Sequence, residues 1–194
     1  MKIFLVLDAS NLKLDLKKLK VNLEKAKNIE HKWVPLQQWH IPLCPLGEVE
    51  AKSLDEIEVK LNRILTHHSS FVLKLDGVWA YPRQDHGRLL WVGVQNVKEL
   101  RSLQEEVFEE LKEFIPEETS EKNFKPYLPI VRFRNFKEVS DLLSPHKNAH
   151  FGKVRINKLI IYEMTSPGSF PTYRKIKEFV MNDEKLINES HISY

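Results

Sequence analysis

Two short stretches of the sequence carry residue types that could perform acid–base or anion-binding chemistry. The first contains His40 and Pro42, and the second, in the other half of the chain, contains Tyr127 and Pro129. Each places a ring residue two positions before a proline. Side chains alternate between the faces of a β-strand, so the two residues of each pair share a face. We therefore expect two matching strands that line a common cleft.

The hydrophobic pattern around these stretches predicts alternating strands and amphipathic helices. Apolar residues spaced three and four apart predict helices with one buried face, and short apolar or alternating runs predict strands. We expect strands over residues 3–7, 33–43, 71–75, 89–94, 127–133, 155–162 and 176–181. We expect helices over residues 12–26, 98–114 and 136–143, and another from a capping box at Ser53 to His67–His68, after a turn at Gly47.

The two halves place a strand motif at a comparable point, which predicts an α+β fold of two related lobes of antiparallel sheet flanked by helices. A central cleft would lie between the lobes. We expect residues 1–181 to form a single two-lobed domain and residues 182–194 to form a C-terminal tail.

Composition narrows the class of protein without naming a partner. Thirty Lys and Arg against 27 Asp and Glu leave a formal charge of +3, which is too small to indicate nucleic-acid binding by itself. The single cysteine, Cys44, excludes an internal disulfide, and no Cys/His cluster has the spacing of a zinc site. The apolar run near the N-terminus is too short for a signal peptide or a membrane span. We expect a cytoplasmic protein with no membrane partner, cofactor or metal.

Other charged and titratable groups could be functional or could simply be exposed to solvent. The polar segment 82–88 carries two arginines and is either a flap that touches a phosphate-bearing ligand or a hairpin loop. Adjacent His67 and His68 suit the C-terminal end of a helix better than a metal site. His86, His146 and His150 are expected in loops, within reach of the cleft but more simply solvated. The lysine-rich run 13–27 flanks an apolar stripe and is expected to be a solvated helix face.

Several separate segments follow one another in the order and spacing of a known family. They are residues 33–35, 40–43, 46–49, 91–94, 124–132 and 159–163. Over residues 1 to about 180 the chain resembles the two-histidine (2H) phosphoesterase superfamily. Within it, the resemblance is to the bacterial RNA 2′,3′-cyclic phosphodiesterases, also called 2′-5′ RNA ligases.

The resemblance implies a His-x-Thr-hydrophobic tetrad in each lobe, with one histidine as general base, the other as general acid, and threonines that hold the phosphate. Imidazole titrates near neutral pH, so two histidines can supply a proton acceptor and a proton donor together. Here His40 matches the first histidine, whereas Pro42, Tyr127 and Pro129 replace the first threonine, the second histidine and the second threonine. Proline lacks both a hydroxyl and an amide hydrogen, and tyrosine stays protonated at neutral pH.

These replacements predict a large loss of hydrolysis. One positioned acid or base contributes roughly 10²- to 10⁴-fold, and each missing phosphate donor adds roughly 10²-fold if it acts like an oxyanion donor. Arg132 occupies a basic position after the second motif, where it is either a phosphate ligand or a surface arginine. The candidate site therefore comprises His40 and Tyr127 as catalytic positions, with Pro42, Pro129 and Arg132 at ligand-binding positions.

Three hypotheses follow. In the first, a pseudoenzyme binds an RNA end or nucleotide of the 2′,3′-cyclic phosphate type, as a monomer, with catalysis lost or strongly reduced. In the second, an active phosphodiesterase uses His40 as the base and Tyr127 as the acid. In the third, prolines and aromatic residues close the cleft, and the fold serves as an interaction scaffold. We favour the first.

Overall fold

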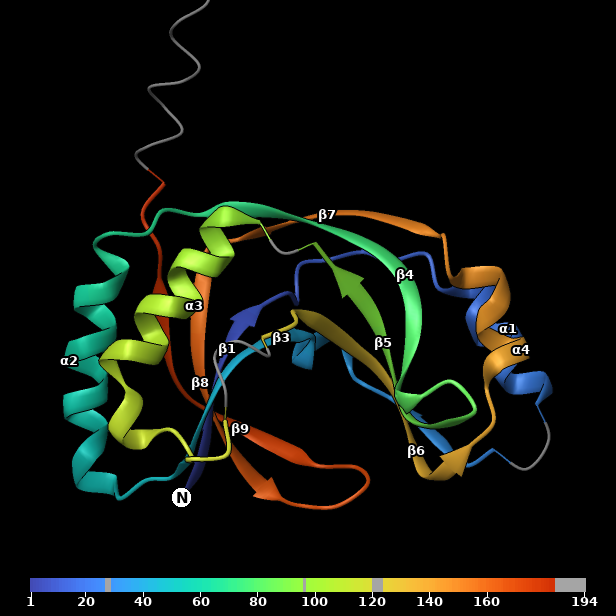
Figure 1. Ribbon diagram of the computed structural model, residues 1–194, viewed down its shortest axis with the longest axis horizontal. Coiled ribbons are helices and arrows are strands. Elements are labelled where there is room, and N and C mark those ends of the chain that lie inside the picture. The colour runs from blue at the N-terminus through green and yellow to red at the C-terminus, as the bar shows by residue number, and fades with distance from the viewer. Residues whose placement is uncertain (27–28, 96, 120–123, 184–194) are drawn as a thin grey trace, which may run out of the picture.

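Two antiparallel sheets form the framework of the molecule (Figure 1). The computed structural model describes residues 1–26, 29–95, 97–119 and 124–183. The four-stranded sheet has the order β3 (His40–Glu48), β1 (Lys2–Asp8), β8 (Lys158–Ser166) and β9 (Thr172–Val180). The five-stranded sheet has the order β2 (His31–Trp33), β6 (Tyr127–Lys137), β5 (His86–Val94), β4 (Phe71–Arg83) and β7 (His150–Ile156).

Helices lie at the two ends of the molecule (Figure 1). At one end, α2 (Leu54–Leu65) and α3 (Lys98–Glu110) pack side by side next to the four-stranded sheet. At the other end, α1 (Lys17–Lys25) packs against the short α4 (Ser140–Leu143). Short 3₁₀ turns are η1 (Leu36–Gln38), η2 (Ala51–Ser53), η3 (Lys112–Phe114) and η5 (Ser144–His146). Within the described chain, no helix has the length and apolar character needed to cross a membrane.

The α+β prediction with two lobes of antiparallel sheet is confirmed, but each lobe draws on both halves of the sequence. The four-stranded sheet combines β1 and β3 with the last two strands of the chain, β8 and β9, and β3 and β6 pack against each other where the sheets meet. The helix spacing was informative for α2, whose buried side chains Ile57, Leu61, Ile64 and Leu65 form an apolar stripe along the expected helix. At the start of the expected tail, the Asn182 carbonyl accepts a hydrogen bond from the Ser70 amide. Residues 184–194 of this tail lie outside the described residues.

Several helix boundaries differ from the prediction. The first helix begins at Lys17, not at Leu12, and the Asp15 carboxylate accepts a hydrogen bond from the Lys17 amide. The expected capping box is wrong, because Ser53 already has helical dihedral angles after η2 and its side chain makes no capping bond. A side-chain cap needs extended backbone at that position. Phe136 lies in β6, so only Ser140–Leu143 of the expected last helix is helical.

Several strand and turn boundaries also differ from the prediction. Residues 155–162 are not one strand, because the chain leaves β7 and enters β8 of the other sheet at Asn157. Of the two interpretations of the polar segment 82–88, the structure shows the hairpin: β4 and β5 continue through the segment and leave a turn of only two residues, Gln84 and Asp85. Gly47 lies within β3 at φ +66°, not in a turn after it.

Gly93 allows β4 and β5 to approach closely, and its replacement tests this packing. A Cβ at residue 93 would lie 2.4 Å from the Asp76 carbonyl oxygen, a backbone atom that cannot move cheaply. Gly93→Ala should therefore lower the free energy of unfolding by about 1–3 kcal/mol in urea titrations. Val72→Ala, at an exposed position of β4, is the control and should cost much less. Equal effects of the two substitutions would contradict the predicted steric conflict.

Candidate functional site

The segment between β2 and β3 carries the chain from one sheet to the other. β2 pairs with β6 in the five-stranded sheet, and β3 pairs with β1 in the four-stranded sheet. The buried Trp39 secures the crossing, because its indole N–H donates to the Val34 carbonyl at 3.0 Å while its own carbonyl accepts from the Ala9 amide at 3.1 Å. Trp39 is thus a core residue, and His40 directly after it begins β3 at the junction of the sheets.

The four motif positions do not share one hollow. His40 and Pro129 line a cavity of about 190 Å³, here called the His40 pocket, together with Arg132. Pro42 and Tyr127 line a separate cavity of about 310 Å³. Register shifts interrupt the pairing of β1 with β3 and of β5 with β6, so the motif strands do not run past the junction in simple alternation.

His40 is held as a neutral imidazole with one nitrogen available. Its side chain is 5% exposed, and its Nδ1 lies 2.6 Å from the Gln38 carbonyl oxygen. A carbonyl can only accept, so Nδ1 carries the proton and Nε2 keeps its lone pair. The pKa of His40 is lowered to about 4, chiefly by burial and to a smaller extent by the Arg132 charge, whereas the Gln38 bond and Asp8 oppose the shift. At neutral pH this group can accept a proton or a hydrogen bond.

Two cations face each other in the same pocket. Lys32 on β2 and Arg132 on β6 are direct cross-strand partners, and both line the His40 pocket. The Lys32 Nζ lies 4.8 Å from the centre of the Phe170 ring, and neither side chain forms an ion pair with another described residue. None of the described residues that line the pocket is acidic. Like charges directly opposite each other are destabilising, so this pair favours a bound anion.

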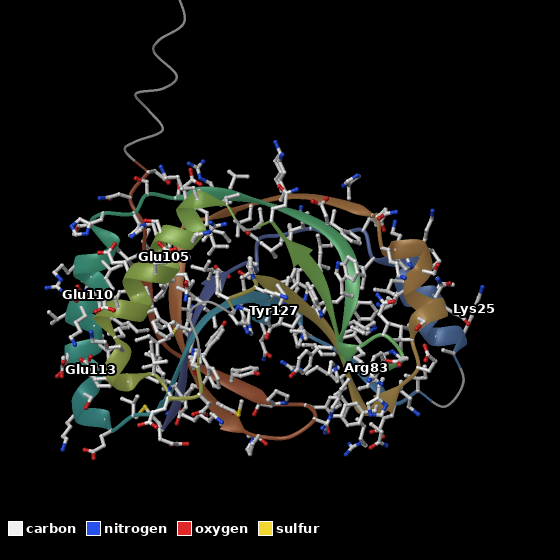
Figure 2. All side chains as sticks on the ribbon, viewed as in Figure 1. Lys25, Arg83, Glu105, Glu110, Glu113 and Tyr127 are labelled. Carbon is white, nitrogen blue, oxygen red and sulfur yellow. The ribbon has the colours of Figure 1, made fainter. Side chains whose placement is uncertain are left out.

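Tyr127 does not line the His40 pocket, but it lines a neighbouring hollow that shares Arg132 with that pocket. Figure 2 shows Tyr127 near the centre of the molecule, between the two sheets. Its ring contacts Trp91 at 5.8 Å between centroids, and it lines a wide hollow of about 820 Å³, here called the aromatic groove, which also contains Arg132. Burial raises the pKa of Tyr127, while Arg132 opposes the shift. Tyr127 therefore remains a protonated hydroxyl at neutral pH.

Three residues around His40 were not predicted from the sequence. Tyr173 packs edge-on against His40 at 5.8 Å between centroids, Tyr162 does so at 5.5 Å, and Thr172 lines the pocket wall. Burial raises the pKa of Tyr173, with an opposing contribution from Arg132. No spacing in the sequence links these residues to His40, because they come from β8 and β9, which reach the site only through sheet pairing.

The other histidines named in the sequence analysis do not line the His40 pocket. His86 stacks on Phe136 with 4.1 Å between ring centroids, and His67 and His68 both contact Glu106 of α3. His146 is buried beside α4, and His150 contacts Asp76. No group of three or more metal-ligating side chains occurs within residues 1–26, 29–95, 97–119 and 124–183.

Comparison with known proteins finds relatives by sequence and by fold. The family model of LigT-like phosphoesterases matches residues 7–91. A curated RNA 2′,3′-cyclic phosphodiesterase of Aquifex aeolicus is 29% identical over 155 residues, covering 77% of this chain and 81% of the relative. The crystal structure of TT0787 of Thermus thermophilus matches with a TM-score of 0.70 at 18% identity, over 95% of this chain and all of that one. E. coli LigT complexed with 3′-AMP matches with a TM-score of 0.65 at 17% identity, over 93% and 97%.

The order of the motifs, the two-sheet fold and these relatives all point to one class of protein. They support the resemblance of the chain to the 2H phosphoesterase superfamily, and the curated relatives it matches are named RNA 2′,3′-cyclic phosphodiesterases.

The lowered pKa of His40 predicts a specific dependence of stability on pH. Unfolding returns the group from a pKa of about 4 to its ordinary value near 6.5, so the unfolded chain binds the proton more readily between these values. The stabilisation is fully present above about pH 6.5 and is lost as the pH falls through about 4, by up to about 3 kcal/mol. Relative to His40→Gln, the wild type should lose unfolding free energy over this range.

Nuclear magnetic resonance provides a direct readout of the same property. The ring C–H signals of His40, assigned by their absence in His40→Gln, should titrate with a midpoint near 4. A midpoint near 6.5 would show that the imidazole is not held in the neutral state by burial.

Proposed function

We propose that the protein binds the phosphate-bearing end of an RNA, or a nucleotide of the 2′,3′-cyclic phosphate type, with catalysis lost or strongly reduced. The observation that carries the proposal is the facing pair Lys32 and Arg132 in a pocket without described acidic residues, beside a neutral His40. The pair supplies two cations, and His40 Nε2 supplies an acceptor for a ribose hydroxyl. Relatives are named as RNA 2′,3′-cyclic phosphodiesterases, and E. coli LigT has been crystallised with 3′-AMP, which supports the ligand class.

The same geometry argues for weak hydrolysis. Pro129 lines the pocket where the family pattern has a threonine hydroxyl, and Pro42 lies in a different cavity. Tyr127 keeps its proton and lines the aromatic groove, so a second imidazole is absent from its expected position. The site keeps the base but lacks the imidazole acid and the two threonine hydroxyls. Ligand binding is therefore retained while turnover is lost or strongly reduced.

The second candidate function is an active phosphodiesterase in which His40 is the base and Tyr127 the acid. It is supported by the available Nε2 of His40, which can accept a proton, and by the protonated Tyr127 hydroxyl, which can donate one. The Arg132 charge lowers the pKa of both residues, so both lie within its electrostatic reach. This candidate requires that His40→Ala and Tyr127→Phe each abolish a measurable wild-type turnover.

Calorimetric titration with 3′-AMP and with a 2′,3′-cyclic nucleotide tests the binding proposal. Arg132→Gln and Lys32→Gln should each weaken binding by about tenfold or more, because each removes a charge-assisted contact with the phosphate. Lys52→Gln is the matched control; it makes the same charge change at an exposed position paired with Glu50, away from the pocket, and should leave affinity unchanged. Unchanged affinity in both pocket variants would refute the proposed phosphate site.

Restoring the family motif tests the proposed loss of catalysis. A triple variant with Pro42→Thr, Tyr127→His and Pro129→Thr should hydrolyse a 2′,3′-cyclic nucleotide at least about 10²-fold faster than the wild type. Adding His40→Ala to the triple variant should remove the gain. Wild-type turnover as fast as that of the restored variant would instead support the active-enzyme candidate.

A further inference from the structure

A row of aromatic side chains crosses one face of the five-stranded sheet beside the His40 pocket. Trp79 on β4 and Trp91 on β5 are cross-strand partners whose rings stack at 6.3 Å with an interplanar angle of 29°. Trp91 in turn contacts Tyr127 of β6 at 5.8 Å. Three adjacent strands thus contribute one ring each. Trp79 is 38% exposed although it is a large apolar side chain, and Tyr81 near it on β4 is 65% exposed.

Two glycines shape the seat of the first ring. A Cβ at residue 77 would lie 2.9 Å from Trp79 Nε1, and a Cβ at residue 93 would lie 3.4 Å from the same atom. The indole therefore lies over backbone that carries no side chain. The two glycines leave room for the Trp79 ring against the backbone. The sheet therefore holds the ring in its partly exposed position.

The aromatic groove is large and positively charged. Its volume of about 820 Å³ falls in the range of ligand sites, and Arg132 belongs to both this groove and the His40 pocket. Arg88 and Lys125 also line it, and none of the described lining residues is acidic. A ligand whose phosphate rests on Arg132 can therefore continue directly into the groove. Aromatic faces combined with cations suit a polyanion that carries flat rings.

Arg88 is positioned before any ligand arrives. Its Nη2 donates to the Ser169 hydroxyl at 2.7 Å, and its guanidinium lies 5.3 Å from the centre of the Phe136 ring. Ser169 lies in the loop between β8 and β9, so this contact joins the two sheets at the edge of the groove. A guanidinium held in this way presents its remaining donors to a backbone phosphate with little loss of side-chain freedom.

We propose that the aromatic groove, with the adjoining Trp79 ring, binds the bases of about two or three nucleotides that precede the phosphate-bearing end of a single-stranded RNA. The inference rests on the proposed function, since it places the terminal phosphate in the His40 pocket. Trp79, Trp91 and Tyr81 provide stacking faces, and Arg88 and Lys125 contact the backbone. A duplex is excluded because its bases are already stacked on one another. Tyr127 then contributes to base stacking at the position where the family motif has its second histidine.

Fluorescence titration of the full chain with RNAs of different length tests the inference. The probes are a mononucleotide 3′-phosphate, a trinucleotide 3′-phosphate, the same trinucleotide without its terminal phosphate, and a duplex of the same sequence. The trinucleotide 3′-phosphate should bind at least about tenfold more tightly than the mononucleotide and should quench tryptophan fluorescence. The duplex should show no such gain.

Variants locate the gain in the groove. Trp79→Ala and Tyr81→Ala should each remove most of the length-dependent gain and leave mononucleotide affinity unchanged, whereas Trp79→Phe should retain most of it because it keeps a stacking face. Val59→Ala removes an exposed apolar side chain from α2 and is the surface control. Tyr81→Ala, at a more exposed position than Trp79, keeps the test decisive if Trp79→Ala does not fold.

The outcomes separate the two proposals. Mononucleotide binding without any gain for the trinucleotide would overturn the groove assignment and leave the phosphate site intact. A gain that persists in both Trp79→Ala and Tyr81→Ala would also overturn it. Trinucleotide binding that does not require the terminal phosphate, with no mononucleotide binding, would support the groove and refute the phosphate site.

Discussion

The site depends on the crossing of the chain between sheets over residues 33–40. β2 must pair with β6, and β3 must pair with β1, so the connecting segment has to bridge the junction in a few residues. The buried Trp39 indole bonded to Val34 holds this bridge, and the Gln38 carbonyl within it fixes the His40 tautomer. Because the same crossing places Lys32 opposite Arg132, one short segment supplies both the charge and the orientation of the pocket.

Burial and charge act together on His40. Removing the ring from water disfavours the imidazolium, and the neighbouring Arg132 disfavours it further. The same cation serves an anionic ligand, so the pocket can hold a phosphate while its histidine stays neutral. The prolines do not disturb this arrangement, since Pro129 contributes only an apolar wall. A pocket suited to a phosphate is therefore compatible with the loss of the groups that would complete its hydrolysis.

Local patterns in the sequence predicted much of the fold, whereas the pocket required pairing between distant strands. The stripe of Ile57, Leu61 and Ile64 is a local signal, and α2 forms as predicted. The division at Asn157 was missed because β7 and β8 follow each other without a break in pattern, and nothing local shows that they enter different sheets. His40 was found from its residue type and spacing, and Arg132 was found through the resemblance of short motifs. Lys32 and Tyr173 were not, because cross-strand register alone brings them to the site.

A crystal structure of the protein soaked with a 2′,3′-cyclic nucleotide tests the central claim most directly. We expect ordered phosphate density between Lys32, Arg132 and the Nε2 of His40, with the cyclic ester intact. An empty His40 pocket at saturating nucleotide concentration, or a ring-opened phosphate in its place, would contradict a binding site that has lost most of its catalysis.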